Sequence, residues 1–237
     1  MDILLHIYLY ILQSLWAADY AWDTPLSNSH STAWREILKD IDKWEKRLPR
    51  YINRSDASVN IIIFADASQN AIATCAYLKT DNDCHLIMAK SKLSPIKGIS
   101  TIPKMEMNAI TIATRLALAV FKNLCTAAHI KDIIILSDSE IALKWLNAPE
   151  DRKGLGVLVT NRRIEIRNIV MEIMAKGPTI QFGYVPTHLN PADCATRGLV
   201  AKEFSSHFWW NGPQYITKHL CRFWVEIDRI IGAFLIL

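Results

Sequence analysis

Glycine is scarce in the first part of the chain, where the first one is Gly98. A phosphate-binding loop needs closely spaced glycines, because the backbone must approach the phosphate groups. Neither G-x-x-x-x-G-K-[ST] nor G-x-G-x-x-G occurs anywhere in the sequence. The sequence therefore excludes both common kinds of glycine-rich nucleotide site.

Paired cysteines are also lacking. The five cysteines are odd in number, and none forms a C-x-x-C pair that would indicate zinc binding or thiol redox chemistry. His219 and Cys221 stand two residues apart, but no second pair completes a four-ligand zinc site. We interpret the cysteines as reduced thiols and expect an intracellular, cytoplasmic protein that is not secreted.

No apolar run reaches the roughly 20 residues needed to cross a bilayer. The apolar segment Met1–Trp16 lacks the basic start of a signal peptide, because it has Asp2 there, and His6 and Gln13 interrupt it. We expect an amphipathic helix in this segment. The apolar run over 230–237 is short, so we expect no membrane partner.

Charge of one sign does not dominate either. The chain has 27 basic and 23 acidic side chains, a net charge of +4, and 51% hydrophobic residues. This composition predicts a folded chain with a sizeable core. It permits nucleic-acid binding without requiring it, so a basic surface would have to be local.

The hydrophobic pattern predicts five strands and several helices. A β-branched run over 59–65 predicts a buried strand that leads directly into Asp66. Pro103 stands at the favoured first position of an amphipathic helix that is expected to end near Asn123. The other predicted elements are strands over 71–78, 85–90, 131–137 and 179–185, helices over 140–146 and 160–174, and a short helix after Pro191. The order βββαβααβ predicts an α/β fold whose first three strands form an antiparallel meander.

Four carboxylates are expected to meet at one edge of this sheet. Two buried strands lead into Asp66 and Asp138, while Glu106 lies in the first turn of the Pro103 helix and Asp193 near the start of the last helix. Such a cluster would repel itself unless cations occupied it. Oxygen ligands favour Mg²⁺ or Mn²⁺. Two such ions, about 3.5–4 Å apart, suit phosphodiester hydrolysis, because one activates the attacking water and the other stabilises the leaving oxygen.

The segments that carry these acids form a recognisable set. They are IIIFADAS over 61–68, STIPKMEMNA over 100–109, IILSDS over 134–139 and VPTHLNPADCATRG over 185–198. In this order they resemble the four acidic motifs of the ribonuclease H domain in Bel/Pao-type LTR retrotransposon polyproteins. The resemblance implies a ribonuclease H-like mixed five-stranded sheet flanked by helices.

The same resemblance implies an activity and a site. The domain would hydrolyse the RNA strand of an RNA·DNA hybrid by two-metal-ion catalysis. Asp66, Glu106, Asp138 and Asp193 would be catalytic and would hold the two Mg²⁺ or Mn²⁺ ions, and His188 would be a mobile catalytic group that assists water delivery or product release. Nine basic residues are predicted to lie around this edge and could line a groove for the phosphates of the hybrid. Each of them is equally well explained as solvated surface charge. They are Lys90, Lys92, Lys97, Lys104, Arg152, Lys153, Arg162, Arg163 and Arg167.

The resemblance also divides the chain. Residues 1–55, predicted to be helical with a helix through Trp34–Trp44, resemble the connector at the end of a reverse transcriptase; 56–200 form the ribonuclease H-like domain; and 201–237 resemble a linker or tail toward an integrase region. Two departures are Lys104, where the family pattern has arginine, and the sequence after Tyr215. Because no Y-x-D-D motif is present, we expect nuclease activity alone, with any reverse transcriptase supplied by another chain.

Three other interpretations stay open at this point. The chain could be a catalytically silent relic that binds nucleic acid or protein without cutting it. It could be an aspartic peptidase, although neither Asp66-Ala-Ser nor Asp138-Ser-Glu supplies the glycine of the D-[ST]-G motif and the predicted helices do not suit an all-β enzyme. It could also be an integrase or transposase core, which uses a similar carboxylate cluster, although the acidic motif over 185–198 favours ribonuclease H.

Overall fold

The computed structural model describes residues 11–48, 58–80, 83–94, 100–149, 152 and 154–218. Within that part, residues 11–17 are helical, which is the end of the amphipathic helix predicted from the sequence. The rest of that helix, the apolar run over 230–237, and His219 with Cys221 lie outside the described residues. No helix in the described part is long and apolar enough to span a bilayer.

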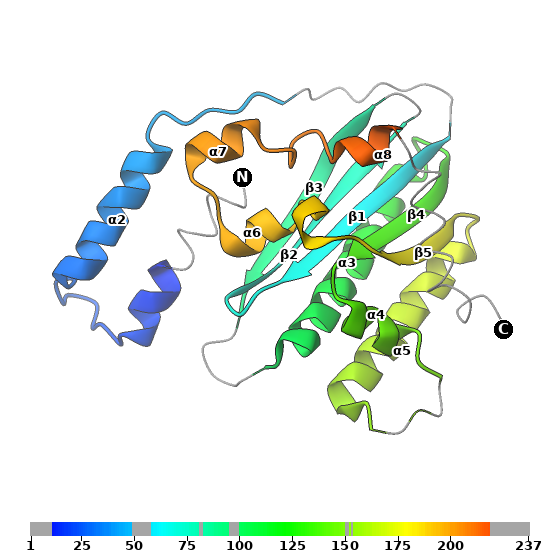
Figure 1. Ribbon diagram of the computed structural model, residues 1–237, viewed down its shortest axis with the longest axis horizontal. Helices are drawn as coiled ribbons and strands as arrows, with labels where there is room; N and C mark the ends of the chain where they lie inside the picture. Colours follow the sequence, from blue (N-terminus) through cyan, green and yellow to red (C-terminus); the bar gives the residue numbers. More distant parts are fainter. Residues whose placement is uncertain are drawn as a thin grey trace.

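A mixed five-stranded sheet forms the centre of the molecule (Figure 1). Its order is β3-β2-β1-β4-β5, with β1 antiparallel to β2, β2 antiparallel to β3, and parallel pairing of β1 with β4 and β4 with β5. The strands are β1 (Val59–Ala67), β2 (Ala71–Lys79), β3 (Cys84–Leu93), β4 (Ile130–Ser137) and β5 (Thr179–Tyr184). The α/β fold class, the meander and the order βββαβααβ are confirmed. β3 runs past its predicted end because its pairing with β2 continues to Leu93.

Helices cover both faces of this sheet (Figure 1). Side chains alternate along β1, so Ile61 and Ile63 join one core, which α3, α4 and α5 cover, while Ile62 and Phe64 join a second core on the opposite face. α6, α7 and α8 lie on that second face. The helices are α3 (Ile102–Leu124), α4 (Glu140–Leu146), α5 (Gly156–Met174), α6 (Asp193–Arg197), α7 (Ala201–Ser206) and α8 (Gln214–Lys218), with a 3₁₀ turn η1 (Thr187–Leu189) before α6. These two covered faces do not match an all-β peptidase.

The N-terminal segment is joined to α7 by side-chain contacts. Its helix α2 (Asn28–Ile41) begins where the Ser27 side chain accepts a hydrogen bond from the His30 amide, and it ends before Trp44, where the expected helix would have continued. Trp44 instead stacks on Phe204 of α7 with ring centroids 5.6 Å apart, and its Nε1 donates to Ser205 Oγ at 2.9 Å. The predicted connector therefore packs against the part of the chain that follows residue 200.

Residues beyond 200 cover the second face of the sheet. Trp209 is almost fully buried, and its carbonyl accepts a 2.7 Å hydrogen bond from the Tyr77 hydroxyl of β2. Phe204 and Trp210 pack beside it with ring centroids 4.5 Å apart. The sheet needs this apolar cover, because β2 is buried along its whole length. The boundary predicted at residue 200 thus falls inside the packed body, which includes α7 and α8.

Gly212 provides a stability test of that packing. It has φ +70°, and a Cβ built on it would lie 2.8 Å from Cys84 Sγ and 3.4 Å from the Tyr77 ring. A Gly212→Ala substitution is expected to cost about 2 kcal/mol or more, because backbone strain adds to a steric clash. The matched control is Gly156→Ala, which has φ +78° and open space around it. Urea unfolding of both variants should show the larger loss for Gly212; equal losses would contradict the described packing.

Candidate metal centre

Asp66 is buried near the end of β1. Only 4% of its surface is exposed, and Oδ2 accepts a hydrogen bond from the Thr196 hydroxyl of α6. Burial is the main cause that raises the pKa of Asp66 to about 7. The Thr196 hydrogen bond and Arg197 lower it, while Asp138 and Asp193 raise it further. In the absence of a cation this carboxylate is therefore protonated in part near neutral pH.

Glu106 approaches from α3. This helix begins at Ile102, one residue before the predicted start at Pro103, and its first turns direct Glu106 toward the sheet. The residue is 7% exposed, and within the described residues its Oε2 atom meets no hydrogen-bond donor. Burial raises the pKa of Glu106 to about 9, and Asp66 and Asp138 add to the rise, while a backbone hydrogen bond from Ala67 opposes it. A buried carboxylate oxygen without a donor needs either a proton or a cation.

Asp138 follows β4, the parallel neighbour of β1. Ala65 and Ser137 are paired in the register, so the acid that follows each of them lies at the same edge of the sheet. The Thr187 hydroxyl donates to Asp138 Oδ2 at 2.7 Å, and Asn190 Nδ2 lies 3.4 Å from its Oδ1. The half-buried Asp138 is therefore oriented by the segment that follows β5.

These three carboxylates form one group. Each of Asp66, Glu106 and Asp138 offers an oxygen, and in the part of the chain that is described these oxygens lie within 4.8 Å of one another. Three hard oxygen donors at this spacing suit a divalent cation such as Mg²⁺ or Mn²⁺. The unpartnered Glu106 oxygen and the raised pKa values of two members show that the group fits a cation chemically.

Asp193, the fourth predicted ligand, stands apart from that group. It is the first residue of α6, and its Oδ1 accepts a hydrogen bond from Arg197 Nε at 2.7 Å. It is close enough to raise the pKa of both Asp66 and Glu106. The structure therefore places Asp193 beside the three carboxylates and pairs it with an arginine.

His188 lies on η1, exposed to solvent. It follows Thr187, which bonds Asp138, so it belongs to the segment that borders the site. Its predicted role as a mobile group stays a prediction. Asn190, two residues later, is buried, and it joins the end of β1 to the α6 loop by donating to the Ala65 carbonyl at 3.0 Å and accepting from the Ala192 amide at 3.1 Å.

Two arginines of the predicted phosphate groove have partners within the chain. Arg162 donates to Asn108 and Glu165, and Arg163 donates to the carbonyls of Ala148 and Pro149. Both arginines therefore join α5 to its surroundings. Among the other predicted groove residues, Lys97 and Lys153 lie outside the described residues.

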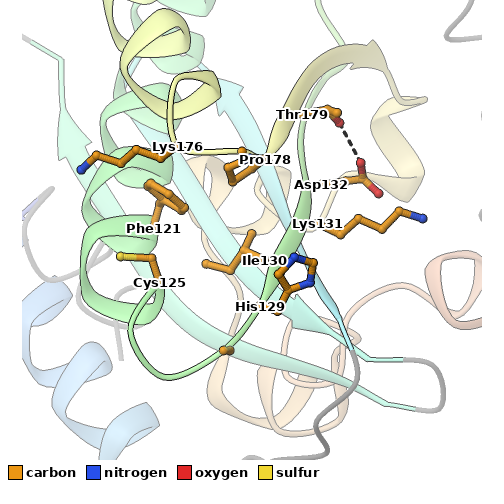
Figure 2. Close-up of a pocket in the computed structure, with 11 residues that line it drawn as sticks. Phe121, Cys125, His129, Ile130, Lys131, Asp132, Lys176, Pro178 and Thr179 are labelled. Carbon is orange, nitrogen blue, oxygen red and sulfur yellow. Dashed lines mark hydrogen bonds between the residues drawn. The ribbon is translucent and has the colours of Figure 1, made fainter.

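A cavity of about 480 Å³ lies at the opposite end of the sheet, around the starts of β4 and β5. Figure 2 shows that the side chains of Lys131 and Lys176 extend away from each other. Asp132 is engaged there, because its Oδ1 accepts a 2.7 Å hydrogen bond from the Thr179 hydroxyl. No charged groups converge in this cavity as they do at Asp66, so the acidic edge is the better candidate site.

Three residues without a predicted role hold the acids in place. Thr196 bonds Asp66, Thr187 bonds Asp138, and Arg197 bonds Asp193. All three stand in the motif VPTHLNPADCATRG over 185–198. For Thr196 and Arg197 the sequence contains a usable signal, because they lie three and four residues after Asp193 and so share one face of a helix with it.

Comparison with models of protein families shows to which family this chain is related. A model of the Pao retrotransposon-like RNaseH-like domain matches residues 3–139, which is more than half of the chain. The chain belongs to this family. The predicted ribonuclease H-like fold and Pao-type family are thereby confirmed. The match contains Asp66, Glu106 and Asp138, spans the predicted connector, and ends before His188 and Asp193.

Solved structures resemble the Pao RNaseH-like chain more distantly. The N-terminal RNase H domain of a Mycobacterium tuberculosis protein is 16% identical, with 63% of this chain and 100% of that chain covered and a TM-score of 0.41. LC11-RNase H1 in complex with an RNA/DNA hybrid is 18% identical, with coverages of 61% and 99% and a TM-score of 0.42. The foamy viral protease-reverse transcriptase in complex with dsDNA is 17% identical, with coverages of 74% and 33% and a TM-score of 0.43. A search of curated proteins found no match. Sequence identities and TM-scores this low describe a general likeness of fold, and nothing about the chemistry of this chain follows from them.

Proposed function

We propose that this Pao RNaseH-like chain is a metal-dependent endoribonuclease that hydrolyses the RNA strand of RNA·DNA hybrids. The observation that carries the proposal is the buried group of Asp66, Glu106 and Asp138, with the unpartnered oxygen of Glu106 inside it. Family membership provides the substrate class, and the carboxylates provide the means of hydrolysis.

The residues of the site have different roles in this proposal. Asp66, Glu106 and Asp138 would hold the first cation, and Asp193 would join them to complete a site for two Mg²⁺ or Mn²⁺ ions. Bound cations would activate a water molecule for attack on the phosphorus and neutralise charge on the leaving oxygen. Thr196 and Thr187 keep Asp66 and Asp138 oriented through their hydroxyl hydrogen bonds. His188, exposed on η1, is the group proposed to assist water delivery or product release.

The test uses the full chain and a hybrid whose RNA strand is labelled. We expect cleavage of that RNA strand in Mg²⁺ or Mn²⁺ and complete inhibition by EDTA. Double-stranded DNA and double-stranded RNA serve as matched substrates that should stay intact. A folded chain that leaves the hybrid uncut in both metals would contradict the enzymatic proposal and leave a ribonuclease H-like binding module.

A further inference from the structure

An ion pair on α6 joins the fourth carboxylate, Asp193, to the guanidinium group of Arg197. Asp193 and Arg197 are the first and last residues of this helix, and Arg197 Nε lies 2.7 Å from Asp193 Oδ1. Their i, i+4 spacing puts both side chains on one face. The Asp193 side chain is 24% exposed and the Arg197 side chain 67% exposed, so the pair is open to exchange with solvent ions.

The position of the pair bears on the metal site. The three grouped carboxylates are Asp66, Glu106 and Asp138, and in the described part of the chain that group does not include Asp193. Thr196, next to Arg197, bonds Asp66 directly, so α6 is fixed against the group. An oxygen of Asp193 that accepts a charge-assisted hydrogen bond from a guanidinium is less available to a metal ion, because two cations compete for one anion.

We propose that Arg197 restrains Asp193 from metal binding, so that the site fills in two stages. The first ion binds Asp66, Glu106 and Asp138, and the second binds after Arg197 has released Asp193. This inference rests on the proposed two-ion function and adds a regulatory element to it. Arg197 thereby sets the metal concentration at which the second ion is bound.

The size of the effect follows from the exposure of the pair. Exposed ion pairs contribute little, so release of Asp193 should change the affinity of the second ion by about three- to sixfold. The affinity of the first ion should change less, since Arg197 makes no hydrogen bond to its three ligands among those described.

The experiment is a calorimetric titration of the full chain with Mn²⁺ in four forms: wild type, Arg197→Gln, Asp193→Asn and the double variant. We expect Arg197→Gln to tighten the weaker Mn²⁺ site about three- to sixfold. In the Asp193→Asn background the same substitution should have a clearly smaller effect, because only the direct influence of the Arg197 charge on Asp66 is left there. Arg197→Lys, which keeps the charge on a single donor group, should fall between wild type and Arg197→Gln.

A control variant separates release of Asp193 from general charge effects. Lys122→Gln removes one positive charge from an exposed pair with Glu172, at the far end of α3 from Glu106, and should leave both Mn²⁺ affinities unchanged. An equal gain from Arg197→Gln with and without Asp193 would overturn the inference, and so would no gain at all. If the wild type cuts the hybrid but Arg197→Gln gives either of these two outcomes, the inference about Arg197 fails and the proposed function stands. If the wild type binds no Mn²⁺, the proposed metal site fails and the inference with it.

Discussion

Asp66→Asn is expected to abolish cleavage of the RNA strand and to stabilise the metal-free protein at the same time. Cleavage should fall by at least about a thousandfold, because the amide cannot provide the negative charge that a cation requires. Metal-free stability should rise at pH 8, since the carboxylate whose pKa burial raises to about 7 no longer has to be ionised in a buried place. The asparagine can still accept the hydrogen bond from Thr196. The gain is on the order of 3 kcal/mol, measured by urea unfolding in EDTA.

The opposite signs of the two effects are what distinguish a functional carboxylate from a structural one. The control is Asp132→Asn at the start of β4, where the asparagine can still accept the hydrogen bond from Thr179. This variant should keep wild-type cleavage and a stability within about 0.5 kcal/mol of the wild type. If Asp66→Asn destabilised the metal-free protein, Asp66 would be a structural residue and the metal-site proposal would lose its main support.

The stability of the metal-free protein is expected to fall as the pH rises from about 6.5 to 9, and added Mn²⁺ should reverse the fall. Asp66 has a folded-state pKa of about 7 against an ordinary value of 3.8, and Glu106 has about 9 against 4.5. The folded state therefore holds more protons than the unfolded state between these values. For each group the stability falls between its ordinary and its folded pKa, with a slope of up to about 1.4 kcal/mol per pH unit. Above about pH 7 the fall is therefore due to Glu106.

Cation binding has the opposite pH dependence, because the ligands must lose their protons before they bind. The stabilisation by Mn²⁺ should therefore be small at pH 6.5 and large at pH 9. Thermal unfolding in EDTA and in Mn²⁺ across this range measures both trends. Glu106→Gln provides the matched comparison, since it should flatten the slope in EDTA between pH 7 and 9. A melting temperature that rises with pH in EDTA would contradict the burial described for Glu106.

The sheet and its acidic edge could be predicted because they depend on local pattern. Continuous β-branched runs indicated β1 and β4, and Pro103 indicated the start of α3. Because neighbouring parallel strands end at the same edge, Asp66 and Asp138 were expected to meet, and the structure brings them together with Glu106. The order of four acidic motifs then indicated the family that the sequence comparison confirmed.

Features that depend on distant packing could not be predicted in the same way. Nothing local in the tryptophan-rich segment after residue 200 indicates that Trp209 covers Tyr77, because that contact joins residues 132 positions apart. The pairing of Asp193 with Arg197 was also missed, although the i, i+4 spacing was visible. The same spacing is also compatible with a free acid that binds metal, and only the folded helix shows that Arg197 competes for Asp193.

The cover that α7 and α8 provide has a consequence for how the chain folds during synthesis. β1 and β2 are made well before α7 and α8, so the second face of the sheet stays only partly covered until Phe204, Trp209 and Ile216 have been made. At about 5–20 residues per second, the wait between β2 and Ile216 lasts on the order of ten seconds. During that time part of an apolar sheet surface is open to misplaced contacts, until α7 and α8 close over the sheet.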